Sequence, residues 1–365
     1  MHLASLDHIR ALAAFMVISW HFLHSTNGYP VAFEGAPFFF PLALLDEGHT
    51  GVALFMTLSG YLFARILEGR NIDYRRFLIN RMLRLLPLLF FVMLLVGVGI
   101  ALQGGDLTGY GKSLIRGIWE PSWPNGGWSI TVELHFYIIL PILIHIGKRS
   151  QIWLVVLILL FFLLRAYIWK NQGEVQFLAY ATLIGRLDQF LLGMLACHWR
   201  GYMKNKHSVA FFVLLSFCVF YWWFDFRGGF YLSPEYPSPS KLWIVLPFVE
   251  GLCYALIIAW YEGSLNIAGR KGPSRWLSQA GAYSYSIYLL HFFFVFDFAD
   301  YINKNIMNIG NFYIACLWAF IFYILMLIPA HFSYRFIESP FLRMRTSYIK
   351  DQAVIDSKAK SLQCL

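Results

Sequence analysis

The chain has 365 residues, of which 59% are hydrophobic, 19% aromatic and 13% charged, and its mean hydropathy is +0.58. Because soluble domains carry about 25% charged residues, this composition excludes a soluble globular protein and indicates a multi-pass membrane protein. The net charge of +9 does not indicate binding to nucleic acid, since most basic residues lie at the ends of apolar segments, where they orient helices in a bilayer.

Ten apolar stretches are long enough to cross a membrane as helices. They cover about residues 9–27, 50–68, 85–102, 128–146, 152–169, 177–198, 209–226, 242–260, 281–298 and 312–334. The predicted fold is therefore an all-α polytopic integral membrane protein with about ten transmembrane helices. Residues 1–345 form one transmembrane domain in this interpretation, and the polar residues 346–365 are expected to be a disordered cytoplasmic tail.

The distribution of basic residues predicts the orientation in the membrane. With the N-terminus in the cytoplasm, 21 of the 29 Lys and Arg fall on the cytoplasmic side, as the positive-inside rule requires. Both termini are then cytoplasmic. The first apolar stretch is expected to be a retained helix rather than a cleaved signal peptide, because it contains His21 and lacks a convincing cleavage site.

The five cysteines predict no further chemistry. Four lie in apolar segments and one in the polar tail, with no CxxC pair and no metal-ligand spacing. They are typical of small buried apolar residues, so neither a disulfide framework nor a metal site is predicted.

The first apolar stretch carries two ionisable residues, Arg10 and His21. Eleven residues of helix turn through about 1100°, so both side chains project from one stripe, about 16–17 Å apart along the axis. Arg10 is then expected at one membrane surface and His21 near the middle of roughly 30 Å of hydrocarbon. Ionisable groups at this depth are costly and mark a functional path by default. The alternative is a structural histidine bonded to a neighbouring helix.

Two other groups are expected to converge with this pair. Arg81 and Arg84 enter the third apolar stretch from the cytoplasm and share a helix face, so they could bracket an anion or simply anchor the helix. Glu133, in Trp128-Ser-Ile-Thr-Val-Glu133, is expected roughly 8 Å below the external surface. A carboxyl there needs a partner or a raised pKa, which suits either proton handling or a structural hydrogen bond.

Three further ionisable residues reach mid-membrane by residue count. His291 is compatible with a functional and with a structural role. Arg186 and Asp188 are expected to be structural and to neutralise each other or partners on adjacent helices.

Taken together, the arginines predict a basic entrance to the protein on its cytoplasmic side, called the basic mouth below. Arg10, Arg81 and Arg84 suit a polyanionic ligand such as a nucleotide that carries phosphates. The titratable His21 lies deeper, and Glu133 is approached from the opposite side. A phosphorylated carrier could hold its charged end in the mouth while its reactive end reaches the bilayer interior.

These residues resemble the motifs of the membrane-bound acyltransferase family 3, the O-acyltransferases of bacterial surface polysaccharides and related acceptors. The resemblance runs from Leu6-Asp7-His8-Ile9-Arg10-Ala11-Leu12 to about Pro340. It rests on the R-x10-H pair Arg10 and His21, Gly51-Val-Ala-Leu-Phe-Met-Thr-Leu-Ser-Gly60-Tyr-Leu, the RxxR pair Arg81 and Arg84, Trp128-Ser-Ile-Thr-Val-Glu133-Leu-His-Phe-Tyr137, Ser284-Tyr-Ser-Ile-Tyr-Leu-Leu-His291 and Phe336-Ile-Glu338-Ser-Pro340. Met56 stands where the family has a second Phe.

The resemblance implies a multi-pass O-acyltransferase of the cell inner membrane, most often an O-acetyltransferase. Acyl-CoA, acetyl-CoA above all, would bind from the cytoplasm at Arg10, Arg81 and Arg84. His21 would be catalytic, with Glu133 orienting the imidazole or the acceptor. The hydroxyl acceptor would be an extracytoplasmic glycan or glycolipid close to Trp128, Ser129, Tyr137 and His291.

Two mechanisms and other functions stay open at this point. His21 could act as general base on the acceptor hydroxyl or as a nucleophile that carries the acyl group. A proton-coupled transporter or flippase of a lipid-linked sugar is the alternative function, although no inverted repeat is visible. A non-enzymatic scaffold is a second alternative function, but it does not explain the buried ionisable groups.

Some family members carry a C-terminal SGNH-type hydrolase domain, and none follows here. A separate periplasmic acyl-transfer protein is therefore expected as a partner, in addition to the lipid bilayer.

Overall fold

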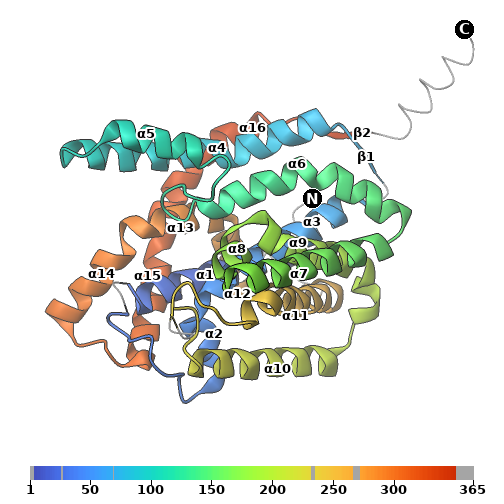
Figure 1. The fold of residues 1–365 in the computed structure, drawn as a ribbon. Helices are drawn as coiled ribbons and strands as arrows, with labels where there is room; N and C mark the ends of the chain where they lie inside the picture. The colour runs from blue at the N-terminus through green and yellow to red at the C-terminus, as the bar shows by residue number, and fades with distance from the viewer. Residues whose placement is uncertain (1–3, 26–27, 69, 232–234, 266–271, 351–365) are drawn as a thin grey trace, which may run out of the picture.

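The computed structural model describes residues 4–25, 28–68, 70–231, 235–265 and 272–350, which are largely helical (Figure 1). The long helices are α1 (Ala4–Leu23), α3 (Gly51–Leu67), α4 (Tyr74–Leu102), α6 (Trp128–Arg149), α7 (Ile152–Gln172), α9 (Leu183–Met203), α10 (His207–Phe226), α11 (Leu242–Ser264) and α15 (Phe312–Ser333). The shorter helices are α2 (Ala43–Asp46), α5 (Leu107–Arg116), α8 (Gln176–Ala181), α12 (Gly272–Ala282), α13 (Ser284–Leu290), α14 (Val295–Tyr301) and α16 (Ser339–Arg343).

Helices occupy the ten apolar stretches, which confirms the predicted all-α multi-pass membrane fold. In the described ranges, seven helices are long and apolar enough to cross a membrane, or eight when the pair α13 and α14, bent by 57°, is counted as one span. The remaining two stretches form α1 and α9. These helices are as long as the others but more polar, since α9 carries Arg186, Asp188 and Arg200.

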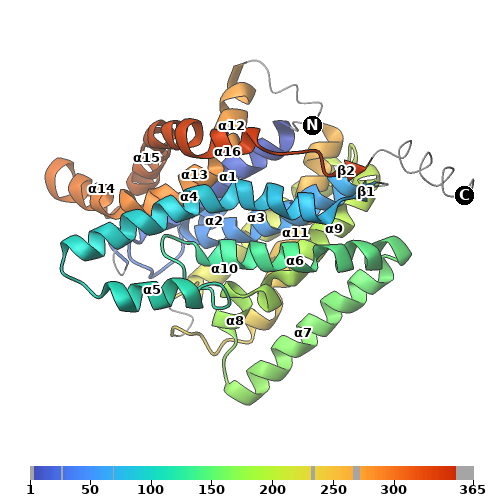
Figure 2. The same ribbon diagram turned by 90° about the horizontal axis from the view of Figure 1, so that it is seen from above.

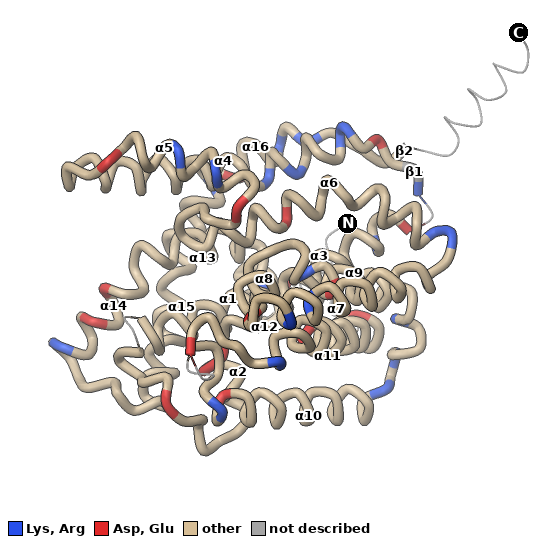
Figure 3. Tube along the Cα trace, in the orientation of Figure 1, with Lys and Arg blue, Asp and Glu red and all other residues tan. Residues whose placement is uncertain are grey.

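Several long helices, among them α4, α6 and α10, run along one common direction, so connections between helices of this set gather at two ends, whereas α15 crosses this direction (Figures 1 and 2). One end carries the α6–α7 and α9–α10 turns and the antiparallel strands β1 (Asn71–Ile72) and β2 (Ile349–Lys350). Lys and Arg are prominent at this end (Figure 3). That distribution is the one expected of a cytoplasmic face, and the orientation stays a prediction.

The centre of the bundle depends on glycine. α3 packs directly against α9, and α9 against α11. A Cβ atom on Gly60 would lie 2.0 Å from the carbonyl oxygen of Phe190, and one on Gly193 would lie 2.0 Å from that of Thr57. Only glycine permits this approach of two helix backbones, which is how small residues bring membrane helices together.

Buried ion pairs join the helices around this centre. Arg165 on α7 donates to Asp188 on α9 at 2.6 Å, and both side chains are fully buried. Arg186 on α9 pairs with Glu250 on α11 at 3.4 Å, and Tyr221 on α10 donates to the same carboxylate at 2.7 Å. Arg186 and Asp188 therefore pair with residues on adjacent helices and not with each other. Pairing with adjacent helices was one of the two structural roles expected from the sequence.

The residues after α16 return to the start of α4. The Asn80 amide donates to Thr346 O at 2.7 Å and accepts from Thr346 N at 3.2 Å, and Asp73 N donates to Tyr348 O at 2.8 Å. Residues 346–350 of the predicted tail are therefore packed against α4. Residues 351–365 lie outside the described residues.

Candidate functional site

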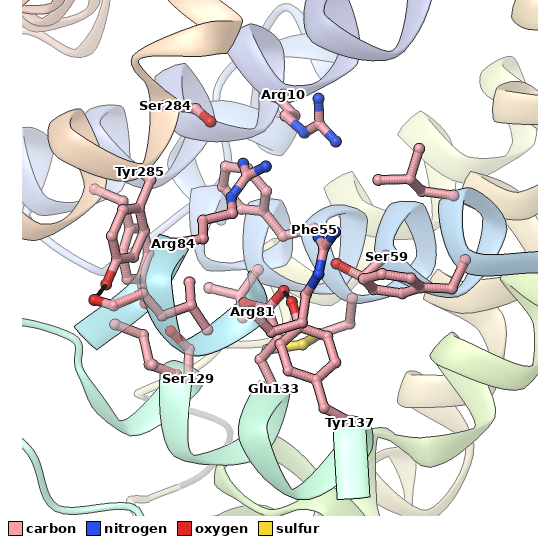
Figure 4. Close-up of a pocket in the computed structure, with 17 residues that line it drawn as sticks. Arg10, Phe55, Ser59, Arg81, Arg84, Ser129, Glu133, Tyr137, Ser284 and Tyr285 are labelled. Carbon is pink, nitrogen blue, oxygen red and sulfur yellow. Dashed lines mark hydrogen bonds between the residues drawn. The ribbon is translucent and has the colours of Figure 1, made fainter. Parts of the chain in front are cut away.

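A first cavity, called the arginine cavity below, lies between α1, α3, α4, α6 and α13 (Figure 4). Its volume is about 90 Å³. Its polar lining consists of Arg10, Ser59, Arg81, Arg84, Ser129, Glu133, Tyr137, Ser284, Tyr285 and Tyr288. Six of the residues singled out in the sequence, at positions 10, 81, 84, 129, 133 and 137, therefore meet in one cavity.

The guanidinium groups of the arginine cavity face a common space from α1 and α4 (Figure 4). Arg81 is only 6% exposed, and its guanidinium carbon lies 5.1 Å from the ring centre of Phe63 and 5.3 Å from that of Phe77. In the described part of the chain neither Arg81 nor Arg84 forms a salt bridge, whereas Arg10 is paired with Asp7. Two guanidinium groups that form no salt bridge with a described residue can bind an anion.

A fourth arginine, Arg345, adds to this charge and was not anticipated from the sequence. Burial, together with the neighbouring Arg84 and Arg81 guanidinium groups, lowers its pKa to about 10. Its Nε and Nη2 atoms are buried without a hydrogen-bond partner among the described residues. The segment docked by Asn80 thus brings a further cation to the arginine cluster.

Glu133 lies on the same side as the arginines. Its carboxylate accepts a hydrogen bond from the hydroxyl of Tyr137, one turn later on α6, and its charge acts on Arg10. Within the described ranges it has no contact with His21 and does not line the cavities in which His21 lies. Its position suits a role beside these arginines rather than beside the imidazole.

His21 lines two other cavities of about 260 and 460 Å³. The first, called the histidine cavity below, is also lined by His49, Trp128, Tyr231 and further aromatic residues. The His21 ring meets the His291 ring edge-on, with centroids 5.1 Å apart, and its Nδ1 atom is buried with no hydrogen-bond partner in the part of the chain described.

His291 lies beside His21 and is fully buried. Its Nδ1 bonds to the carbonyl oxygen of Ile287 at 3.2 Å, which requires the proton on Nδ1. Its Nε2 therefore carries a lone pair, and no partner for it exists among the residues that the structure describes. Two neighbouring imidazoles with unused nitrogen atoms can accept or pass on a proton.

The arginine cavity and the histidine cavity share a wall. Val52 on α3 and Tyr288 on α13 line both cavities. The Tyr288 hydroxyl donates to the carbonyl oxygen of Gly126 at 3.1 Å, just before α6. Two successive residues at the start of α6 face different cavities, because Trp128 lines the histidine cavity and Ser129 the arginine cavity.

Sequence reasoning missed a second polar group at the histidine cavity. His49 Nε2 lies 2.8 Å from Glu47 Oε2, and His24 Nε2 lies 3.2 Å from Asp46 Oδ1. Burial raises the pKa of Glu47, and the adjacent Asp46 raises it further. The run Asp46-Glu47-Gly48-His49, directly before an apolar stretch, was a signal that could have identified this group.

Comparison with known proteins identifies the family. A family model described as an acyltransferase domain matches residues 3–330. The chain belongs to this acyltransferase family. The resemblance drawn from the motifs is thereby confirmed. No solved structure matches the acyltransferase chain significantly.

Three relatives illustrate the names found in this acyltransferase family. The chain is 25% identical, over 93% of its length and 55% of the relative's, to "Putative peptidoglycan O-acetyltransferase YrhL" of Bacillus subtilis. It is 26% identical, over 95% of its length and 60% of the relative's, to "Putative O-acetyltransferase SAR0937" of Staphylococcus aureus. It is also 26% identical, over 68% of its length and 66% of the relative's, to "Putative membrane-bound transacylase BcsY" of Komagataeibacter xylinus. The chain thus spans little more than half of the first two relatives.

Proposed function

We propose that the chain is an integral O-acyltransferase of the inner membrane that moves an acyl group, acetyl in the first instance, from cytoplasmic acyl-CoA to a hydroxyl of an extracytoplasmic glycan or glycolipid. The observation that carries the proposal is the wall that the arginine cavity and the histidine cavity share at Val52 and Tyr288. One cavity is lined by arginines and the other by histidines and aromatic residues, and the two meet at one wall. This arrangement suits a reaction whose two substrates arrive from opposite sides of the membrane. The names of the relatives, which mention O-acetyl transfer and transacylation, support this reaction class.

The arginine cavity is the donor side in this proposal. The phosphates of CoA bind Arg81 and Arg84 by charge-assisted hydrogen bonds, with Arg345 close by, and the thioester arm extends along the cavity past Arg10 toward the shared wall. Glu133 and Tyr137 hold the base of this cavity by their mutual hydrogen bond, so that Glu133 positions the arginines for the donor.

His21 carries out the chemical step from the histidine cavity. As general base it takes the proton of the acceptor hydroxyl while the hydroxyl oxygen bonds to the acyl carbon and the carbon–sulfur bond breaks. The proton then passes from the imidazolium to the leaving thiolate, so that CoA departs as a thiol. His291, with an unused Nε2 beside the His21 ring, is placed to receive or return that proton. In the alternative mechanism the acyl group is first carried on the His21 imidazole.

The test uses purified chain in detergent with acetyl-CoA and an envelope extract from cells that lack the chain. Release of free CoA thiol and gain of acetyl esters on the glycan are measured together. His21→Gln should slow transfer by roughly 10²- to 10⁴-fold, the contribution typical of a general base. His145→Gln, an exposed position on α6 outside the cavities, is the matched control and should retain the full rate.

The outcomes are distinct. If His21→Gln and His145→Gln transfer acetyl groups equally fast, His21 takes no part in the chemistry. Movement of a lipid-linked sugar across vesicles without release of CoA would support the transporter or flippase alternative. An acetyl group found on His21 by mass spectrometry after rapid quenching would select the acyl-carrier mechanism over direct transfer.

A further inference from the structure

The wall of the histidine cavity is mostly aromatic. Trp20 and Tyr231 stack with ring planes 3° apart and centroids 5.7 Å apart, and Phe230 packs edge-on against Trp20 at 5.4 Å. Trp128 and Tyr180 form a second aromatic pair with centroids 5.0 Å apart. The cavity has a volume of about 260 Å³, which is close to the lower limit of the roughly 300–1,000 Å³ typical of sites for small ligands.

His49 places an unused polar atom at this aromatic wall. Its side chain is fully buried, its Nε2 is held by Glu47 Oε2 at 2.8 Å, and its Nδ1 has no hydrogen-bond partner within the described ranges. The other oxygen of Glu47 accepts a hydrogen bond from the backbone N–H of Phe230 at 3.1 Å. One carboxyl group therefore fixes both the imidazole and the aromatic wall.

A second side chain braces the same wall. The amide of Gln176 donates to Phe230 O at 2.8 Å, and its oxygen accepts from the backbone N–H of Ser238. Gln176 is fully buried and lines the cavity, as does Tyr236, which is 49% exposed and lies at the mouth. Side chains held in this way are preorganised for a ligand, because little ordering remains to be done on binding.

We infer that the histidine cavity is a carbohydrate subsite, in which a pyranose ring of the acceptor packs against the aromatic wall and one ring hydroxyl bonds to His49 Nδ1 while another reaches His21. The inference rests on the proposed function. His49 is an acceptor-binding residue here and takes no part in bond making.

The chemistry of the wall favours a sugar over a hydrocarbon occupant. A lipid chain could pack against the aromatic rings but would leave His49 Nδ1 and His21 Nδ1 buried without hydrogen-bond partners. Burial of an unpaired polar atom costs free energy. A pyranose offers C–H faces that pack on aromatic rings and hydroxyls that can pair with both nitrogen atoms.

The inference is tested on the full chain in detergent with the envelope extract as acceptor. His49→Gln keeps an amide that can bond to Glu47 but removes the Nδ1 atom, so the apparent KM for the extract should rise about tenfold with kcat within about twofold. Tyr231→Leu should raise the same KM about tenfold, whereas Tyr231→Phe, which keeps the ring, should restore it. His145→Gln is again the control.

A binding measurement makes the test independent of catalysis. Soluble glycan fragments from the same extract are examined by saturation-transfer NMR with the wild-type chain and the Tyr231→Leu variant. Sugar-ring protons should receive saturation from the wild type and lose most of it with the variant. The KM for acetyl-CoA, measured at saturating extract, should be the same in all these variants as in the wild type, because their substitutions lie away from the arginine cavity.

Each outcome bears on one of the two proposals. If glycan fragments bind through Tyr231 but no CoA is released in any sample, the subsite stands and the proposed function fails. If CoA is released with the extract but the KM is the same for His49→Gln, Tyr231→Leu and the control, the subsite is refuted and the proposed function stands. A rise in the KM for acetyl-CoA in these variants would assign the cavity to the donor and would also overturn the inference.

Discussion

Replacement of Arg81 by Gln tests the donor site most directly. Arg81 is 6% exposed and forms no salt bridge in the described part of the chain, so its charge is available to a ligand. A hydrogen bond to a charged group contributes about 1.5–3 kcal/mol. Since about 1.4 kcal/mol corresponds to a factor of ten, the KM for acetyl-CoA should rise about 10- to 150-fold.

The assay is initial-rate CoA release at saturating acceptor extract, with acetyl-CoA varied. Because the guanidinium group also lies over Phe63 and Phe77, thermal unfolding is measured alongside to separate loss of packing from loss of binding. Arg81→Lys keeps the charge but cannot bind a phosphate with two parallel N–H groups, so its KM should fall between those of the wild type and Arg81→Gln. Arg75→Gln, at an exposed arginine on the same helix, is the control.

Two results would refute this reasoning. If Arg81→Gln and Arg75→Gln have the same KM for acetyl-CoA as the wild type, the cavity does not bind the donor phosphates. If Arg81→Gln lowers only the amount of inserted protein, with unchanged KM, Arg81 is an orientation anchor of the kind that the positive-inside rule describes.

Two further predictions concern the core and the shared wall. Arg165→Met should lower the free energy of unfolding by about 3–5 kcal/mol, because it leaves Asp188 buried and unpaired. The double variant Arg165→Met with Asp188→Leu should recover most of this loss, measured by thermal unfolding. Equal melting temperatures for the single and the double variant would contradict this prediction. Tyr288→Ala should open the wall between the cavities and raise acetate formed by hydrolysis relative to acetyl ester formed by transfer, measured by mass spectrometry. Tyr283→Ala, whose hydroxyl bonds to His331 outside the cavities, is the control, and an unchanged ratio would show that Tyr288 is no barrier.

Hydropathy and residue spacing predicted much of the fold and of the donor cavity. A bilayer forces each spanning segment to be long, apolar and helical, so the ten stretches were recognisable without tertiary information. Spacing also places Arg81 and Arg84 on one face of α4, because residues three apart are neighbours on a helix. The meeting of both with Arg10 in one cavity agrees with the expected basic mouth, whereas Glu133 was expected on the opposite side and lies in the same cavity.

The residue pattern along one helix does not show which residues of other helices its side chains contact. Glu133 was expected at a suitable depth, but the rotation of α6 directs it to the arginines rather than to His21. The partner of Asp188 is Arg165, on another helix, and no local pattern links them. Arg345 follows the last apolar stretch among other basic residues, which are common at the cytoplasmic ends of helices and therefore carry little signal.

The wall at Val52 and Tyr288 also bears on the energy supply of the cell. A membrane that stores free energy as an ion gradient cannot tolerate an open aqueous channel. In the proposed function the arginine cavity and the histidine cavity meet at this wall, so only a small uncharged acyl fragment would have to pass, while the anionic carrier would stay with Arg81 and Arg84. Such a protein could export activated acyl groups without short-circuiting the gradient across its own membrane.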